Sequence, residues 1–186
     1  MNMLVTADID TYFEKPYWLL DTLPKQVPAG SPGQYFKVEK HFLSKLEAIA
    51  VKFANILIKL NCFNDLQVSL DGESWTGDFS PEDLERFFSE SVSSHSPIYI
   101  LVCPGHPLEG IPGNEVGIDI GAPSEGGRFF ASLRMTGTPS KGALITFSGE
   151  DHYMTLYGPD EELLALIRQL AGSEGLFVWS HEENIH

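Results

Sequence analysis

The segment from Gln34 to Leu60 constrains the fold most, because apolar residues recur in it at every third or fourth position. No glycine or proline interrupts the segment. This spacing keeps one side of a 3.6-residue helix apolar, and about 27 residues at 1.5 Å each form a rod of roughly 40 Å. We therefore expect a long helix over residues 34–60 to be the spine of the fold. Its apolar positions are Tyr35, Val38, Phe42, Leu46, Ile49, Phe53, Ile56 and Leu60.

Short apolar runs bounded by turn residues predict the strands. Residues 66–70 alternate between apolar and polar and end at Asp71-Gly72, which is a turn signal. The continuous apolar run over 98–102 is typical of a central buried strand. Further strands are expected over 17–23 (or an ordered arm), 116–120, 128–135, 143–147, 153–156 and 176–179. Turns over 136–141 and 148–151 would join three of these strands into an antiparallel meander.

Two shorter helices have clear start signals. Ser80-Pro81 supplies a capping side chain and a proline at the first helical position, and acidic residues follow in the first turn. A final helix is expected after Gly158-Pro159, with Leu163, Ile167 and Leu170 facing inward and Gly172 at the C-terminal cap.

These elements predict an α+β fold, in which a long N-terminal helix and two shorter helices pack on a largely antiparallel sheet. A mixed α/β fold is the alternative. We expect one globular domain over residues 1–186. It would comprise an N-terminal arm and loop (1–33), the long helix (34–60), the sheet with two helices (65–179) and a polar tail (180–186).

Charge is distributed unevenly along the chain. Residues 1–64 contain seven lysines and six acidic residues, whereas residues 65–186 contain five basic and twenty acidic residues. The formal net charge of −14 favours a basic protein partner, or simply solubility, and disfavours nucleic acid. The one basic stripe consists of Lys45, Lys52 and Lys59. We expect its aliphatic stems to cover apolar surface while its ammonium groups meet the chain's own acids.

Location is predicted from hydropathy and cysteine content. No run of about eighteen apolar residues suits a membrane span, and residues 1–10 lack the basic region of a secretory signal. Cys62 and Cys103 are too few for a disulfide scaffold or a structural zinc site. We expect a cytoplasmic protein with reduced thiols and no membrane partner.

Metal and nucleotide binding have little support in the sequence. His181 and His186 flank two glutamates, but a spacing of five residues does not place both imidazoles on one helical face. The glycines over 110–127 do not form a dinucleotide or phosphate-binding loop. No metal and no cofactor are therefore expected.

Cys103 and His106 form the sharpest catalytic pattern. A thiol at the end of a buried strand, three residues from an imidazole, would form a nucleophilic pair oriented by Asp119 or Asp151. This pattern indicates a cysteine-dependent hydrolase or transferase. The competing interpretation is that Cys103 is a small buried apolar residue, which is the commoner role of a cysteine at a strand end.

An acidic segment with embedded aromatic residues suggests a docking surface. Carboxylates there would steer a cationic partner, while an aromatic ring supplies buried contact. The expected partner-binding residues are Asp71, Glu73, Trp75, Asp78, Glu82, Asp83 and Glu85. The competing interpretation is a solvated face in which Trp75 and Phe79 point into the core.

The favoured functional hypothesis is a non-enzymatic module that docks a basic protein partner. A small immunity or inhibitor protein that covers a cationic toxin or nuclease fits this size and charge. The cysteine-dependent enzyme is the alternative.

Overall fold

The computed structural model describes residues 5–25, 32–77, 79–104, 132–135 and 142–180. The strand expected over 116–120 and most of the polar tail lie outside these residues.

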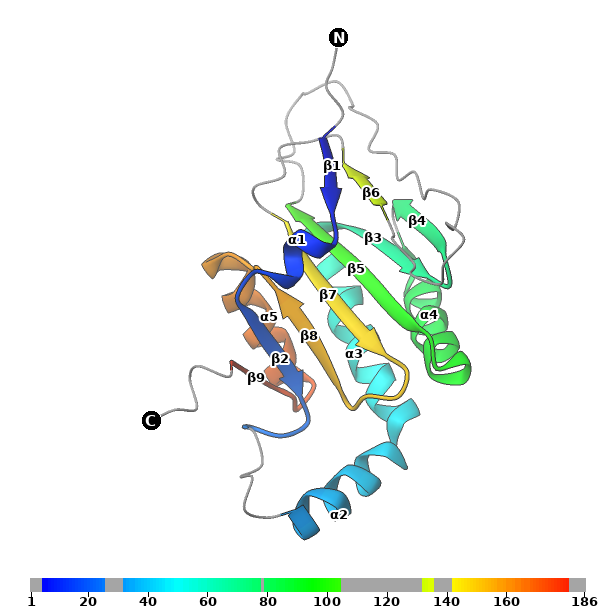
Figure 1. Ribbon diagram of the computed structural model, residues 1–186, viewed down its shortest axis with the longest axis vertical. Helices are drawn as coiled ribbons and strands as arrows, with labels where there is room; N and C mark the ends of the chain where they lie inside the picture. The colour runs from blue at the N-terminus through cyan, green and yellow to red at the C-terminus, as the bar shows by residue number, and fades with distance from the viewer. Residues whose placement is uncertain (1–4, 26–31, 78, 105–131, 136–141, 181–186) are drawn as a thin grey trace.

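A seven-stranded antiparallel sheet, in the order β4-β3-β5-β7-β8-β2-β9, organises the fold (Figure 1). Its strands are β2 (Tyr17–Asp21), β3 (Asn64–Leu70), β4 (Glu73–Gly77), β5 (Pro97–Pro104), β7 (Ala143–Ser148), β8 (Tyr153–Tyr157) and β9 (Phe177–Trp179). The helices are α1 (Asp10–Phe13), α2 (Pro32–Leu43), α3 (Leu46–Asn61), α4 (Pro81–Ser94) and α5 (Glu161–Ser173). The expected α+β class is confirmed.

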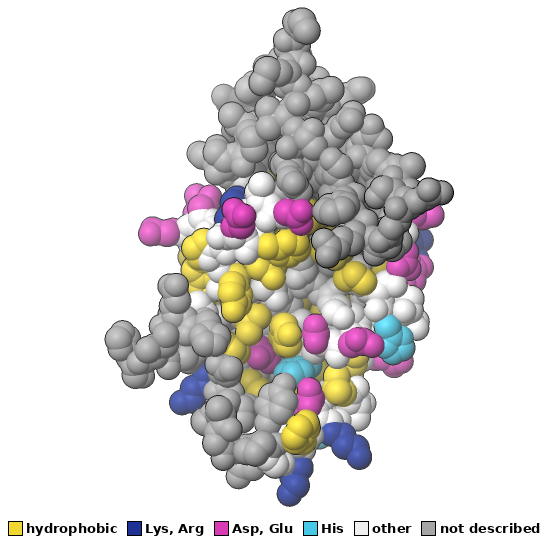
Figure 2. All heavy atoms as spheres, viewed as in Figure 1, with side chains coloured by type: hydrophobic (Ala, Val, Ile, Leu, Met, Phe, Trp, Pro, Cys, Tyr) yellow, Lys and Arg dark blue, Asp and Glu magenta, His cyan; other side chains and the backbone are white. Residues whose placement is uncertain are grey.

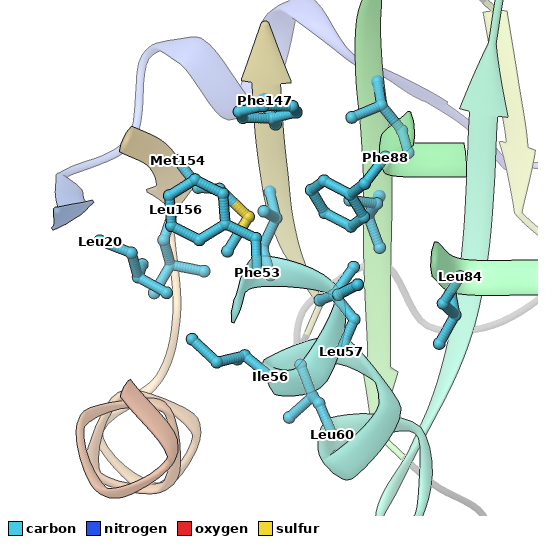
Figure 3. Packing of buried hydrophobic residues seen from close by; sticks show 14 of the residues in the cluster. Leu20, Phe53, Ile56, Leu57, Leu60, Leu84, Phe88, Phe147, Met154 and Leu156 are labelled. Carbon is cyan, nitrogen blue, oxygen red and sulfur yellow. The ribbon is translucent and has the colours of Figure 1, made fainter. Parts of the chain in front are cut away.

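Among the described elements, three helices cover one face of the sheet, and the short α1 covers one end of the other face. In Figure 1, α3, α4 and α5 lie behind the strands, whereas the short α1 crosses in front. The main core fills the space between the three helices and the sheet (Figure 3). Phe53 of α3 is at its centre, with its ring 5.4 Å from that of Phe147 on β7 and 6.4 Å from that of Phe88 on α4. Full burial of each such side chain stabilises the fold by about 1.5–3 kcal/mol.

The single long helix expected over 34–60 is wrong, because the helix breaks at Ser44 and Lys45. The Lys45 amide donates to the carbonyl of Phe42 in a tight turn, and Lys45 itself has non-helical dihedral angles of −122° and 18°. The Ser44 hydroxyl donates to the carbonyl of His41. The break directs α2 away from the sheet (Figure 1) and lets Phe42 stack on His152, with 5.6 Å between ring centroids.

The expected three-strand meander is also wrong. β7 and β8 form a hairpin, but β6 (Ser132–Met135) pairs with β1 (Val5–Asp8) in a separate two-stranded sheet. Strand β4, which the sequence did not predict, pairs with β3 across the expected Asp71-Gly72 turn.

The starts of the two shorter helices are confirmed, but one end is not. The Ser80 hydroxyl accepts from the Asp83 amide, and the Asp83 carboxylate accepts from the Ser80 amide, forming a capping box. At the end of α5 the cap is Glu174 followed by Gly175 at φ +70°, not Gly172. Leu176 donates back to Ala171 and Gly175 to Gly172, which satisfies the last carbonyls of the helix.

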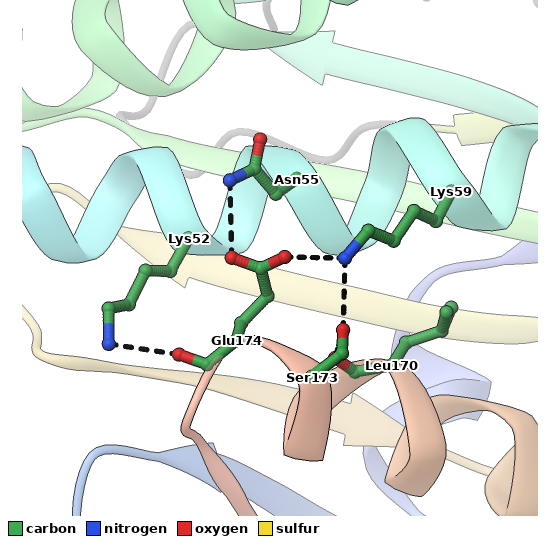
Figure 4. A network of polar contacts seen from close by, with 6 residues as sticks. All are labelled: Lys52, Asn55, Lys59, Leu170, Ser173 and Glu174. Atoms are coloured by element: carbon green, nitrogen blue, oxygen red, sulfur yellow. Dashed lines mark hydrogen bonds and ion pairs between the residues drawn. The ribbon is translucent and has the colours of Figure 1, made fainter.

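Two lysines of the expected stripe, Lys52 and Lys59, meet the end of α5, and of these two Lys59 pairs with an acidic side chain (Figure 4). The Lys59 ammonium lies 2.5 Å from the Glu174 carboxylate, and Asn55 donates to the same carboxylate at 3.2 Å. Lys52 donates to the Glu174 main-chain carbonyl at 2.9 Å. These contacts tie α5 to α3, and the hydrogen bond from Lys59 lowers the pKa of Glu174 below its ordinary value.

We expect Glu174→Gln to destabilise the fold at pH 7 and to do so less at pH 3. A lowered pKa in the folded state stabilises the protein above the ordinary pKa of glutamate, and this stabilisation is lost as the pH falls through the folded value. The difference at pH 7 should stay below about 1 kcal/mol, because Lys59 is partly exposed and water screens the pair. Urea unfolding at both pH values measures the effect, with Glu85→Gln, an exposed acid on α4, as the control at pH 7. A difference that is as large at pH 3 as at pH 7 would contradict the prediction.

Candidate functional site

Of the proposed catalytic residues, Cys103 and Asp151 lie within the described part of the chain, whereas His106 and Asp119 lie outside it. The structure does not bring the two together, because Cys103 is near the C-terminal end of β5 and Asp151 is in the β7–β8 turn beside the other end of that strand. Cys103 lies opposite Asp65 of β3 and packs half-buried against the small cluster formed by α1 and the sheet. Burial, and secondarily the nearby Asp65 carboxylate, raise the pKa of the Cys103 thiol to about 11. Because the thiolate is the nucleophilic form, these surroundings favour a packing role for Cys103.

We expect iodoacetamide at pH 8 to alkylate Cys62 in the folded protein well before Cys103. Cys62 is exposed after the end of α3, whereas Cys103 is half-buried and protonated at this pH. Peptide mass spectrometry over a time course measures the two rates, with protein unfolded in urea as the control in which both thiols react. Rapid alkylation of Cys103 in the folded state would revive the cysteine-enzyme hypothesis.

The proposed acidic docking residues lie at the β4 edge of the sheet and on the neighbouring helix α4. Trp75 of β4 packs against Phe87 of α4, with 4.6 Å between ring centroids, and this contact holds the two elements together. Glu73 precedes Trp75 by two residues and is exposed, as is Glu85, two residues before Phe87. Carboxylates therefore flank this contact on both elements.

The remaining members of the expected set differ in their roles. Asp71 in the hairpin turn and Glu82 in the first turn of α4 are exposed. Asp83 caps α4, and its hydrogen bonds with Ser80 lower its pKa below the ordinary value. Arg86 lies 3.3 Å from Asp83, and Asp78 is outside the described residues.

The aromatic rings of this edge face the core. Trp75 and Phe79 are both half-buried, and the Phe79 ring meets Phe87 edge-on at 5.9 Å. The outward surface of α4 is therefore mainly charged, with Glu82, Glu85 and Glu90 exposed around Arg86.

A second site, not anticipated from the sequence, lies on the sheet face opposite the three helices. Strand registers align Tyr99 with Thr146 and Thr146 with Thr155 across β5, β7 and β8. The adjacent row aligns Tyr17 with Tyr157. Figure 2 shows hydrophobic side chains gathered over the middle of this face, with acidic side chains beside them. Alternation of Tyr153, Thr155 and Tyr157 with buried Met154 and Leu156 is the sequence signal that could have identified this face.

Helix α1 covers one end of this face. Ile9 and Tyr12 are buried against Leu101 and Leu144. At the end of α1, Phe13 meets Tyr157 edge-on, with 5.0 Å between ring centroids. Phe13 therefore forms an aromatic wall beside the part of this face that no described helix covers.

A hollow of about 160 Å³ lies next to this wall. Phe13, Tyr99, Thr146, Ser148, Asp151 and Tyr153 contribute to its lining. Burial raises the pKa of the Asp151 carboxyl above its ordinary value, although the neighbouring His152 opposes this effect. An aromatic hollow that contains a partly desolvated carboxylate is suited to a cation.

His152, which follows Asp151 in the β7–β8 hairpin, forms a buried pair with Asp21 of β2. The His152 Nε2 is 3.9 Å from the Asp21 carboxylate, which also accepts from the Leu23 amide and the Thr22 hydroxyl. Burial raises the pKa of Asp21 despite these contacts. Because Phe42 stacks on His152, the pair links β2, the β7–β8 hairpin and α2.

The described residues form neither a metal-binding cluster nor a membrane-spanning helix. No group of three His, Cys, Asp or Glu side chains there is arranged to hold a metal ion. The His181–His186 cluster lies outside these residues. No helix of the described chain combines the length and apolar character needed to cross a bilayer.

The described residues form an α+β protein in which three helices cover one sheet face, aromatic side chains line the other face, and exposed carboxylates form an acidic edge. The acidic edge consists of Asp71, Glu73, Glu82 and Glu85. No family model matches the chain, and no curated protein or solved structure is significantly similar to it.

Proposed function

We propose that this chain is a cytoplasmic, non-enzymatic module that docks a basic protein partner, in the manner of an immunity or inhibitor protein. The observation that carries the proposal is the outward projection of carboxylates from α4 and the β3–β4 turn. Glu82 and Glu85 are exposed, and Arg86, the one basic residue on α4, is already engaged by Asp83.

Electrostatics explains how such a surface would work. Carboxylates on one edge raise the local concentration of a cationic protein and orient its approach, and the effect weakens as salt rises. Helix α4, which carries Glu82 and Glu85, is held in place because Phe87 and Phe88 pack in the core. Two unpaired cysteines fit a reducing compartment.

Charge neutralisation on α4 tests the proposal. The double variant Glu82→Gln/Glu85→Gln should recover a basic partner from a lysate about tenfold less than the unmodified chain, because each charge contributes on the order of 0.5–1 kcal/mol. Glu161→Gln/Glu162→Gln is the matched control, since these exposed acids occupy the first turn of α5.

Salt dependence provides the second readout. Retention of the partner should fall between about 0.05 M and 1 M salt, because the Debye length shrinks severalfold over that range. Partners that are neutral, or that both double variants retain equally at all salt concentrations, would refute the acidic edge as the docking surface.

A further inference from the structure

We propose that the hollow between Phe13, Tyr99 and Tyr153 binds the guanidinium group of an arginine side chain presented by a basic protein partner. This inference deepens the proposed function, on which it rests, by naming an anchor distinct from the acidic edge.

The two ends of the hollow differ in chemistry. Strand register places Pro97 opposite Ser148 at the hairpin end, where Asp151 follows in the turn. Two residues along the same strands, Tyr99 lies opposite Thr146. Phe13 belongs to the other end, because its ring packs on Tyr157. One end therefore offers a carboxylate and the other offers aromatic surface.

Within the described residues, no lysine or arginine forms an ion pair with the Asp151 carboxylate, and the basic group that acts on it is the adjacent His152. The Asp151 amide donates to the carbonyl of Ser148, which fixes the turn, while the His152 side chain points to Asp21. Partial burial disfavours an isolated negative charge, so a bound cation would relieve this unfavourable state.

Guanidinium suits these surroundings better than ammonium. Its planar group stacks on aromatic faces, is weakly hydrated, and donates two parallel hydrogen bonds to one carboxylate. The volume of about 160 Å³ admits a side chain but not a folded element. Thr146 and Thr155, which are aligned across β7 and β8, contribute hydroxyl-bearing side chains to the lining. Charge complementarity with a chain of net charge −14 identifies the occupant as basic.

A peptide titration tests the site. The probe is acetyl-Gly-Arg-Gly-amide, and the matched control replaces arginine with citrulline, which keeps the shape and removes the charge. We expect the arginine peptide to shift the amide NMR signals of residues 146–155. The citrulline peptide should bind at least about tenfold more weakly, because the ion pair and the cation–π contact are lost.

Protein variants locate the interaction. Asp151→Asn is nearly isosteric and keeps the turn's main-chain bond, so it should fold and yet weaken arginine binding at least about tenfold. Glu150→Gln neutralises the adjacent, exposed acid and should change binding less than about twofold. Urea unfolding of both variants verifies that they are folded. Equal binding of the citrulline peptide, or unchanged binding by Asp151→Asn, would overturn the assignment.

The outcomes also separate the two proposals. If the peptide does not bind in the hollow but Glu82→Gln/Glu85→Gln loses a basic partner, the arginine site alone is refuted. If the peptide binds as expected but no basic, salt-sensitive partner is recovered, the docking function fails and the arginine site remains.

Discussion

Replacing Gly149 with alanine is expected to destabilise the protein by roughly 3 kcal/mol or more. A Cβ atom at this position would lie 1.9 Å from the carbonyl oxygen of Ser91 and 2.9 Å from the Cα of Val92. Both are backbone atoms of α4, so no side-chain rotation relieves the overlap. The Ser91 carbonyl also accepts from the amides of His95 and Ser96, and the helix end therefore cannot move without breaking its own termination.

Gly172→Ala is the matched control for this substitution. Gly172 lies within α5, is exposed, and would place its Cβ in open space. Alanine there should stabilise the protein by about 0.5–1 kcal/mol, because it favours the helix and restricts the unfolded chain. Urea unfolding monitored by circular dichroism measures both variants. A Gly149→Ala protein within about 1 kcal/mol of the unmodified chain would show that α4 and the hairpin are not in contact as described.

The same contact connects the two proposed binding surfaces. Gly149 and Asp151 belong to the β7–β8 turn, and Ser91 belongs to the helix that carries the acidic residues. The position of Asp151 in the hollow thus depends on close packing of the turn against α4. Gly149→Ala should therefore weaken arginine-peptide binding in whatever fraction of the protein remains folded.

Local signals predicted much of the fold correctly. Ser80 caps α4 as expected, Leu163 and Ile167 face inward from α5, and the apolar run over 98–102 forms an interior strand. Each of these features depends on periodicity or capping chemistry within a few residues. Non-local features were missed. Nothing in the chain around Ser44 predicts the helix break, and the stacking that accompanies it joins Phe42 to a distant residue, His152.

The candidate sites also differ in whether they depend on local sequence or on contacts between distant residues. The acidic edge could be predicted from composition because its residues are close in sequence. The inward packing of Trp75 could not, because it depends on Phe87 of another element. The hollow could not be predicted at all. It requires the register of β5, β7 and β8 together with the docking of α1, and single-sequence patterns specify neither.

Phe53→Ala is expected to reduce the free energy of unfolding by about 3–5 kcal/mol. Phe53 has no exposed surface, and its ring contacts Phe147 of the sheet and Phe88 of α4 (Figure 3). The cavity left by the deleted ring would be bounded by a helix, a second helix and a strand. These elements are held by other contacts, so the walls cannot collapse to fill it.

Val51→Ala on the same helix separates the loss of packing from any change in helix propensity. Val51 is 49% exposed, so its truncation should change the free energy of unfolding by less than about 0.5 kcal/mol. Thermal and urea unfolding of the two variants provide the comparison. Because whole domains are stable by only about 5–15 kcal/mol, Phe53→Ala would leave a protein near its folding threshold. Equal effects of the two substitutions would mean that α3 does not present Phe53 to the sheet. The arrangement in which α3 covers one face of the sheet, and the aromatic hollow lies on the other face, would then be wrong.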